Sequence, residues 1–131
     1  MLEAGIKNRK CLSVGQAETA KSMRSGTLPV LATPAMIALM EETAAESVEA
    51  LLDEGVTSVG THIAVSHLAA DPIGATVMCE SELTEVDGRR LSFRLTVRDR
   101  QGIVGEGTHE RFLVRKESFL KKAEERLGEN G

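Results

Sequence analysis

The feature that most constrains the fold is one long predicted helix followed by segments in which apolar and polar residues alternate. Residues 33–55 read TPAMIALMEETAAESVEALLDEG, and the helix-favouring residues Ala, Leu, Met and Glu dominate this stretch. Thr33 is a favourable N-cap, Pro34 suits the first helical position, and Gly55 is a natural C-terminal stop. We therefore predict one long helix over this segment.

Beyond this helix, apolar residues alternate with polar ones, as they do in strands. The alternation predicts strands over residues 56–69, 74–86, 89–100 and 103–115. The third strand is the clearest, because Leu91, Phe93 and Leu95 alternate with polar or charged residues. Asp87 and Gly88 form a strong hairpin signal before it. One apolar and one polar face are typical of an antiparallel sheet that is covered on one side.

The remaining segments complete the predicted domain. A first strand is expected within residues 10–22, a loop over 23–32, and a short amphipathic helical tail over 117–127. We predict a single α+β domain spanning residues 1–131, with its core over about 10–116. In this fold the long helix covers one face of a curved antiparallel sheet, because no other segment is long enough to do so.

Composition excludes several classes of protein. The 131 residues are 41% hydrophobic, which is enough for one globular domain, and the net charge of −4 argues against a nucleic-acid partner. No apolar run approaches the roughly 20 residues needed to cross a bilayer, and no signal-peptide core is present, so we expect a cytoplasmic protein without a membrane partner. Cys11 and Cys79 fit no metal or redox spacing, and we expect neither metal nor cofactor.

The predicted helix carries a carboxylate on its apolar side. At 100° per residue, one apolar stripe contains Ile37, Met40, Ala44, Val48, Leu51 and Leu52. Glu41 lies four residues after Ile37 and three before Ala44, within this stripe. A buried charge costs several kcal/mol unless it is paired or protonated, so such a residue is a candidate for acid–base catalysis. The alternative is that Glu41 lies at the edge of the stripe and extends into solvent.

The residues VGTHIAVSHLAADPIG, over 59–74, contain two histidines in a predicted strand. His67 shares the parity of Ile63 and Val65 and therefore points to the apolar face, either as a functional residue or as a satisfied core histidine. His62 has the opposite parity, and His109 is a third candidate with no better claim. Thr33, in the same way, is either a simple N-cap or part of a site.

Four segments together resemble a known family. They read LATPAMIALMEETA, SVGTHIAVSHLAADPIGATV, EVDGRRLSFRLTVRD and GEGTHERF, and the similarity runs from about residue 30 to 118. The chain resembles the hotdog-fold acyl-CoA thioesterases, and most closely their fluoroacetyl-CoA thioesterase branch. This resemblance implies a hotdog fold, in which a curved antiparallel sheet wraps one long central helix.

The resemblance also implies an activity and a set of site residues. It implies hydrolysis of acyl-CoA thioesters, with Thr33, Glu41 and His67 as the catalytic set. A backbone N–H at Gly60 is implied to bind the thioester, and Arg111 corresponds to a further site residue. The loop RSGTLPVL before the helix lacks the phenylalanines that cover the acyl group in the specialised enzyme. We therefore expect a more open acyl pocket.

Regular elements of one chain cannot bring all five residues to one thioester. Thr33 and Glu41 would lie about 12 Å apart along the helix. Gly60 and His67 would lie about 23 Å apart on a strand, and on opposite faces. Antiparallel pairing of residues 57–70 with a second copy, centred between Ile63 and Ala64, would put Gly60 opposite the other copy's His67. We therefore predict a homodimer with sites at the subunit interface, and leave open a tetramer of two dimers.

The implied roles are as follows. Glu41 acts as the base or as a nucleophile, and His67 protonates the leaving thiolate. Thr33 attacks or positions the water, the Gly60 N–H stabilises the oxyanion, and Arg111 holds a CoA phosphate or closes the site. Two alternatives stay open: a non-catalytic acyl-CoA-binding or sensor domain, and a hotdog hydratase acting on enoyl thioesters.

Overall fold

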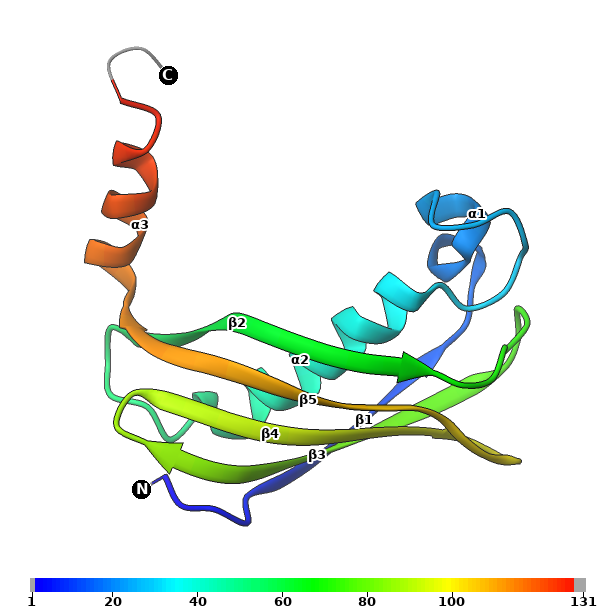
Figure 1. The fold of residues 1–131 in the computed structure, drawn as a ribbon, viewed down its shortest axis with the longest axis horizontal. Helices are drawn as coiled ribbons and strands as arrows, with labels where there is room; N and C mark the ends of the chain where they lie inside the picture. Colours follow the sequence, from blue (N-terminus) through cyan, green and yellow to red (C-terminus); the bar gives the residue numbers. More distant parts are fainter. Residues whose placement is uncertain (1, 129–131) are drawn as a thin grey trace.

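The computed structural model describes residues 2–128 and has α+β architecture (Figure 1). Its elements, in chain order, are β1 (Lys7–Ser13), the 3₁₀ helix η1 (Gln16–Glu18), α1 (Ala20–Met23), α2 (Thr33–Glu49), β2 (Val56–His67), β3 (Thr76–Asp87), β4 (Arg90–Asp99), β5 (Gly102–Arg115) and α3 (Lys116–Glu125). Across the described residues, no helix is long and apolar enough to cross a membrane.

All five strands form one antiparallel sheet in the order β1-β3-β4-β5-β2. β1 and β2 are therefore its two edges. The helix α2 packs against β1, β2, β3 and β4 on one face of the curved sheet, while α3 projects away from it (Figure 1). The predicted arrangement of a long helix covered by a curved antiparallel sheet is confirmed.

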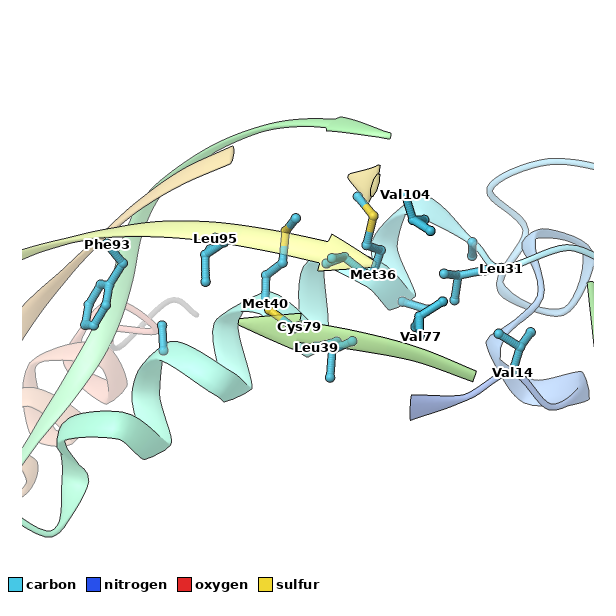
Figure 2. Packing of buried hydrophobic residues seen from close by; sticks show 14 of the residues in the cluster. Val14, Leu31, Met36, Leu39, Met40, Val77, Cys79, Phe93, Leu95 and Val104 are labelled. Atoms are coloured by element: carbon cyan, nitrogen blue, oxygen red, sulfur yellow. The ribbon is translucent and has the colours of Figure 1, made fainter. Parts of the chain in front are cut away.

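The core lies between α2 and the sheet. Met36 and Met40 point from the helix toward the inner face of the sheet, where Leu95 and Val104 lie (Figure 2). Alternate residues of β4 are completely or almost completely buried, as the sequence alternation predicts: Leu91, Phe93, Leu95 and Val97. Burial of each such side chain contributes about 1.5–3 kcal/mol. The last four strands begin and end within two residues of their predicted bounds.

The prediction for residues 10–22 is wrong beyond Ser13. The segment turns into η1 and α1 because two local capping arrangements end the strand. The Gly15 N–H donates to the Glu18 carboxylate at 2.9 Å, and the Thr19 hydroxyl accepts from the Ser22 N–H at 3.2 Å. Each arrangement gives a backbone N–H at the start of a short helix a side-chain acceptor within the same segment. In a strand, that N–H would instead bond to a neighbouring strand.

The long helix is shorter than predicted and is capped differently. Ala32 is the N-cap, Thr33 is the first helical residue, and the helix ends at Glu49 rather than at Gly55. Its buried face is rotated by about one residue from the predicted stripe and comprises Ala35, Met36, Leu39, Met40, Thr43, Ala44 and Val48. Glu41 therefore lies at the border of this face rather than within it, and Leu51 is exposed beyond the helix.

A β-bulge changes the faces of β2. The register with β5 shifts between Gly60 and His62, which leaves Thr61 as the extra residue. Gly60 therefore faces Glu41 and Arg111 on the inner side of the sheet, and His67 also faces inward to Thr33. The prediction that Gly60 and His67 lie on opposite faces is wrong, because simple alternation does not hold across a bulge.

Candidate active site

One half of the candidate site joins the start of α2 to the end of β2. The Thr33 Oγ1 lies 2.8 Å from the His67 Nδ1, which is hydrogen-bond distance. In the tautomer protonated on Nε2, the threonine hydroxyl donates to this nitrogen; in the other tautomer the roles are reversed. Thr33 is the first helical residue and not the N-cap, and its hydroxyl bonds to His67.

A pocket of about 330 Å³ lies beside this pair. Two backbone segments that meet here shape it, since the Leu31 N–H donates to the Asp71 carbonyl at 2.8 Å and Val30 pairs with Pro72. The pocket is lined by Ala20, Ser25, Val30, Leu31, Thr33, His67, Leu68, Ala69 and Ala70. Apart from His67, these side chains, all in the described part of the chain, are small or aliphatic and uncharged.

The other half gathers around Gly60, near the other end of β2. A Cβ atom placed on Gly60 would lie 2.7 Å from the Glu41 Oε2 and 3.4 Å from the Arg111 Nη1. The Arg111 Nη1 lies 3.9 Å from the same carboxylate oxygen. The side chain of Glu41 is 43% exposed and that of Arg111 is 10% exposed. A glycine at position 60 thus leaves the carboxylate accessible beside a largely buried guanidinium.

Arg111 is fixed by the neighbouring strand. Its Nε donates to the Ser58 Oγ at 2.7 Å, and its Nη2 donates to the Ser58 carbonyl at 3.0 Å. Burial lowers the pKa of this guanidinium, and the charges of Glu41 and Glu49 oppose that effect. The side chain thus points into the protein, with its Nη1 toward Glu41.

His109 completes this half of the site and is a residue to which sequence reasoning gave no role. It is only 1% exposed, its Nδ1 lies 2.7 Å from the His62 carbonyl oxygen, and its Nε2 lies 3.1 Å from the Arg111 Nη1. One feature of the sequence could have identified His109 as a site residue. It lies two residues before Arg111 in a predicted strand, so both side chains point to the same face.

Both inward-facing histidines sit in environments that favour the neutral imidazole. Burial lowers the pKa of His67. Burial also lowers the pKa of His109, where the bond to the His62 carbonyl opposes the effect and the nearby positive charge of Arg111 adds to it. Both rings can therefore accept a hydrogen bond or a proton at neutral pH.

The structure thus brings the predicted residues together in two groups and not in one. Thr33 and His67 form the first group, while Glu41, Gly60 and Arg111 form the second. Glu41 follows Thr33 by eight positions in the helix, a distance of about 12 Å along the axis of α2. Neither group alone contains both an accessible carboxylate and the threonine–histidine pair.

Solved structures define the class of this fold. A hot-dog-like protein from Thermanaerovibrio acidaminovorans matches with a TM-score of 0.88 at 27% identity, over 95% of this chain and 93% of that chain. A threonine-to-serine mutant of the fluoroacetyl-CoA thioesterase FlK, in complex with acetyl-CoA, matches with a TM-score of 0.91 at 32% identity, over 96% and 99% of the two chains. The protein has a hotdog fold, as the sequence resemblance implies.

Sequence comparisons narrow the class to one family. The family model of the fluoroacetyl-CoA-specific thioesterases matches residues 14–117. The fluoroacetyl-CoA thioesterase of Streptantibioticus cattleyicolor is 41% identical over 97 residues, which cover 74% of this chain and 70% of that protein. The chain belongs to the family of fluoroacetyl-CoA-specific thioesterases, and it is an acyl-CoA thioesterase.

Proposed function

We propose that the protein hydrolyses acyl-CoA thioesters at a composite site, to which one subunit contributes Thr33 and His67 and its partner contributes Glu41, Gly60 and Arg111. The observation that carries the proposal is the separation of these residues into two groups, one at the last residue of β2 and the other around Gly60 in its first half. An antiparallel dimer brings opposite ends of a strand together, and would make two equivalent sites.

The free edge of β2 supports such a dimer. β2 pairs only with β5, so its other edge leaves backbone groups available to a second strand. Its twelve residues include no Asp, Glu, Lys or Arg, and Thr61, His62, Ala64 and Ser66 are exposed. Edge strands that must stay unpaired commonly carry charges, and this one carries none.

The faces of β2 select the register of this pairing. Directly opposed residues of an antiparallel pair point to the same side of the sheet. Ile63 packs inward and Ala64 is exposed, so a register centred between them would oppose an inward and an outward residue. A register centred on Ala64 instead opposes Ile63 with Val65 of the partner subunit. The bulge at Thr61 then brings Gly60 opposite His67 of the partner subunit.

The proposed reaction uses the two groups from opposite subunits. Glu41 takes a proton from water as the water oxygen bonds to the thioester carbonyl carbon. The Gly60 N–H stabilises the oxyanion, and Thr33 positions the attacking water. The carbon–sulfur bond then breaks, and the neutral His67 takes up the proton held by Glu41 and passes it to the departing thiolate, so that both groups return to their starting state. The products are a carboxylate, free CoA and one proton, which balances the hydrolysis of a thioester by one water.

The pocket beside Thr33 and His67 is the proposed site of the acyl group. Six of its nine lining residues are Ala, Val or Leu, which suits an uncharged acyl chain. The family is named for the fluoroacetyl-CoA-specific thioesterase FlK. In this chain, none of the residues that line the pocket, all in the described part, is a phenylalanine. We therefore propose that this protein accepts short aliphatic acyl groups broadly and does not select fluoroacetyl strongly over acetyl.

The test is a thiol-release assay of the purified protein against a panel of acyl-CoAs from acetyl and fluoroacetyl to octanoyl. The matched variants are Glu41→Ala, on the β2 side of α2, and Glu42→Ala, on the opposite flank. We expect turnover of short members, loss of turnover in Glu41→Ala and near-normal turnover in Glu42→Ala. Binding of CoA esters without thiol release would contradict the proposal and favour a binding domain, while hydration of crotonyl-CoA would favour a hydratase.

A further inference from the structure

We propose that His109 is a positioning residue that holds the Arg111 guanidinium beside Glu41, and that it does so only as a neutral imidazole protonated on Nδ1. This inference rests on the proposed function, because it gives His109 a role in keeping the reactive carboxylate correctly placed. His109 itself does not touch the substrate in this account. It acts through Arg111.

The hydrogen-bond partners of His109 determine its tautomer. The Nδ1 lies 2.7 Å from the carbonyl oxygen of His62, which only accepts, so this nitrogen carries the proton. The Nε2 lies 3.1 Å from the Nη1 of Arg111, which only donates, so this nitrogen offers its lone pair. One tautomer of the neutral ring satisfies both partners. The doubly protonated ring would instead direct an N–H at the guanidinium.

This bond controls the one part of Arg111 that approaches the reactive carboxylate. Ser58 holds the Nε and Nη2 of the guanidinium at 2.7 and 3.0 Å. The Nη1, which lies 3.9 Å from the Glu41 Oε2, has only His109 as a hydrogen-bond partner among the described residues. Without that acceptor, one Nη1–H would either lack a partner, at a cost in free energy, or turn toward Glu41, and the second change would alter the position of the carboxylate.

The surroundings of His109 keep it neutral. The ring is almost completely buried, with Phe93 of β4 in a tilted arrangement at 6.1 Å between ring centroids. The charged or titratable groups near it are Arg111 on its own strand, Glu41 on α2 and His62 on β2. Burial, Arg111 and His62 oppose protonation, and only the Glu41 charge and the His62 carbonyl favour it.

Two substitutions separate the two hydrogen bonds of His109. In His109→Asn the amide nitrogen can take the place of Nδ1 and keep the bond to the His62 carbonyl, but nothing accepts from Arg111. In His109→Gln the longer side chain can place its amide oxygen near the position of Nε2 and accept from Arg111. Both variants remove the ring and one hydrogen bond, so they are matched in their structural cost.

We expect kcat of His109→Asn to fall about 100-fold, the size of loss that a small misplacement of a reacting group causes, with little change in KM. His109→Gln should regain most of this loss and stay within about tenfold of the wild type. Thermal unfolding of the two variants should differ little. Equal activities in the two variants, whether both high or both low, would overturn the positioning role.

A spectroscopic measurement tests the tautomer without any turnover. Long-range ¹H–¹⁵N NMR of the histidine rings distinguishes a protonated Nδ1 from a protonated Nε2, and His109→Gln assigns the signal. We expect a neutral ring with its proton on Nδ1 at pH 7. A doubly protonated ring, or a proton on Nε2, would overturn the inference. If the wild type hydrolysed no thioester while the expected tautomer was seen, the failure would lie with the proposed function and not with the contact between His109 and Arg111.

Discussion

The two edges of the sheet differ in length, in charge and in their relation to α2. β1 has seven residues, among them Lys7, Arg9 and Lys10, whereas β2 has twelve residues and no charged side chain of the Asp, Glu, Lys or Arg type. The Lys10 Nζ lies 3.1 Å from Glu46 and 3.6 Å from Glu42 on α2. On the β2 side, the comparable place on α2 holds Glu41, which faces a glycine.

By this difference, β1 is an edge strand protected against pairing with another strand, and β2 is an unprotected one. Lysines and arginines on β1 discourage pairing with another strand, and their ion pairs to α2 and β3 lie in solvent, where such pairs contribute little to stability. β2 lacks such protection, and both groups of candidate site residues lie along it, one at His67 and one around Gly60. In the proposed dimer, β1 ends the sheet and β2 continues it into the partner subunit.

The largest expected effect is a difference in kcat between substitutions on the two flanks of α2. Glu41→Gln removes the proposed base while keeping the size of the side chain, and we expect kcat to fall about 10³-fold. Glu42→Gln removes only an exposed ion pair with Lys10, and should leave kcat within about twofold, because such pairs contribute little. Steady-state thiol release measures both. Similar losses in the two variants would break the proposed difference between the flanks.

The second prediction places a charge on each edge. Ala64→Lys puts two like charges opposite each other at the proposed two-fold axis, so we expect monomers and a loss of activity of about 100-fold or more. Cys11→Lys adds the same charge to the exposed face of β1, and should change neither property. Size-exclusion chromatography with light scattering, together with the thiol assay, would show this. A dimeric, active Ala64→Lys protein would contradict pairing through β2.

The third prediction tests the space beside Glu41. In Gly60→Ala the added Cβ would lie 2.7 Å from the Glu41 Oε2, so the carboxylate must move away. Because the end of a glutamate side chain moves easily, we expect a decrease of kcat by about 10- to 100-fold with only a small change in thermal stability. Gly107→Ala is the contrasting variant, since its Cβ would clash with the backbone carbonyl oxygen of Ala64 and should destabilise the fold. An active Gly60→Ala enzyme would mean that Glu41 needs no such room.

The smallest effect concerns the loop that follows β2. Asp71 is buried, and burial together with the neighbouring Asp99 raises the pKa of its carboxyl to about 6. A pKa raised by folding stabilises the folded state below about pH 4 and loses that contribution as pH rises past about 6. Asp71→Asn should therefore raise the free energy of unfolding by about 1–2 kcal/mol at pH 7.5 and hardly change it at pH 4.

Denaturant unfolding at the two pH values measures this effect, with the exposed Asp53→Asn as the control variant. An Asp71→Asn protein that is less stable than the wild type at pH 7.5 would contradict the account of this loop.

The comparison also shows what sequence patterns can predict. The helix from Thr33 and the strands after Gly55 follow from local composition and alternation, and the confirmed fold rests on them. Among the candidate site residues, Glu41 was identified from its position on the helix and His67 from its parity in the strand. The family resemblance implied all five.

The rest depends on long-range register, which no local pattern carries. The bulge at Thr61 is defined only by pairing with β5, some 50 residues later in the chain, and it reverses the predicted face of Gly60. The role of His109 depends on a carbonyl of His62 and on Arg111, and the first of these contacts is set by the same pairing. The two capping arrangements between β1 and α1 join residues that are close in sequence, so they could have been predicted. They were missed because residues 10–22 were interpreted as one strand.

Subunit complementation tests the composite site most directly. Glu41→Gln and His67→Ala should each be inactive as homodimers, because each lacks one half of every site. In a mixed dimer, one site would combine the intact Glu41 of one chain with the intact His67 of the other. Random mixing after refolding should therefore restore about a quarter of wild-type activity. If the mixture stays as inactive as the separate variants while mixed dimers form, each site belongs to a single chain and the account is wrong.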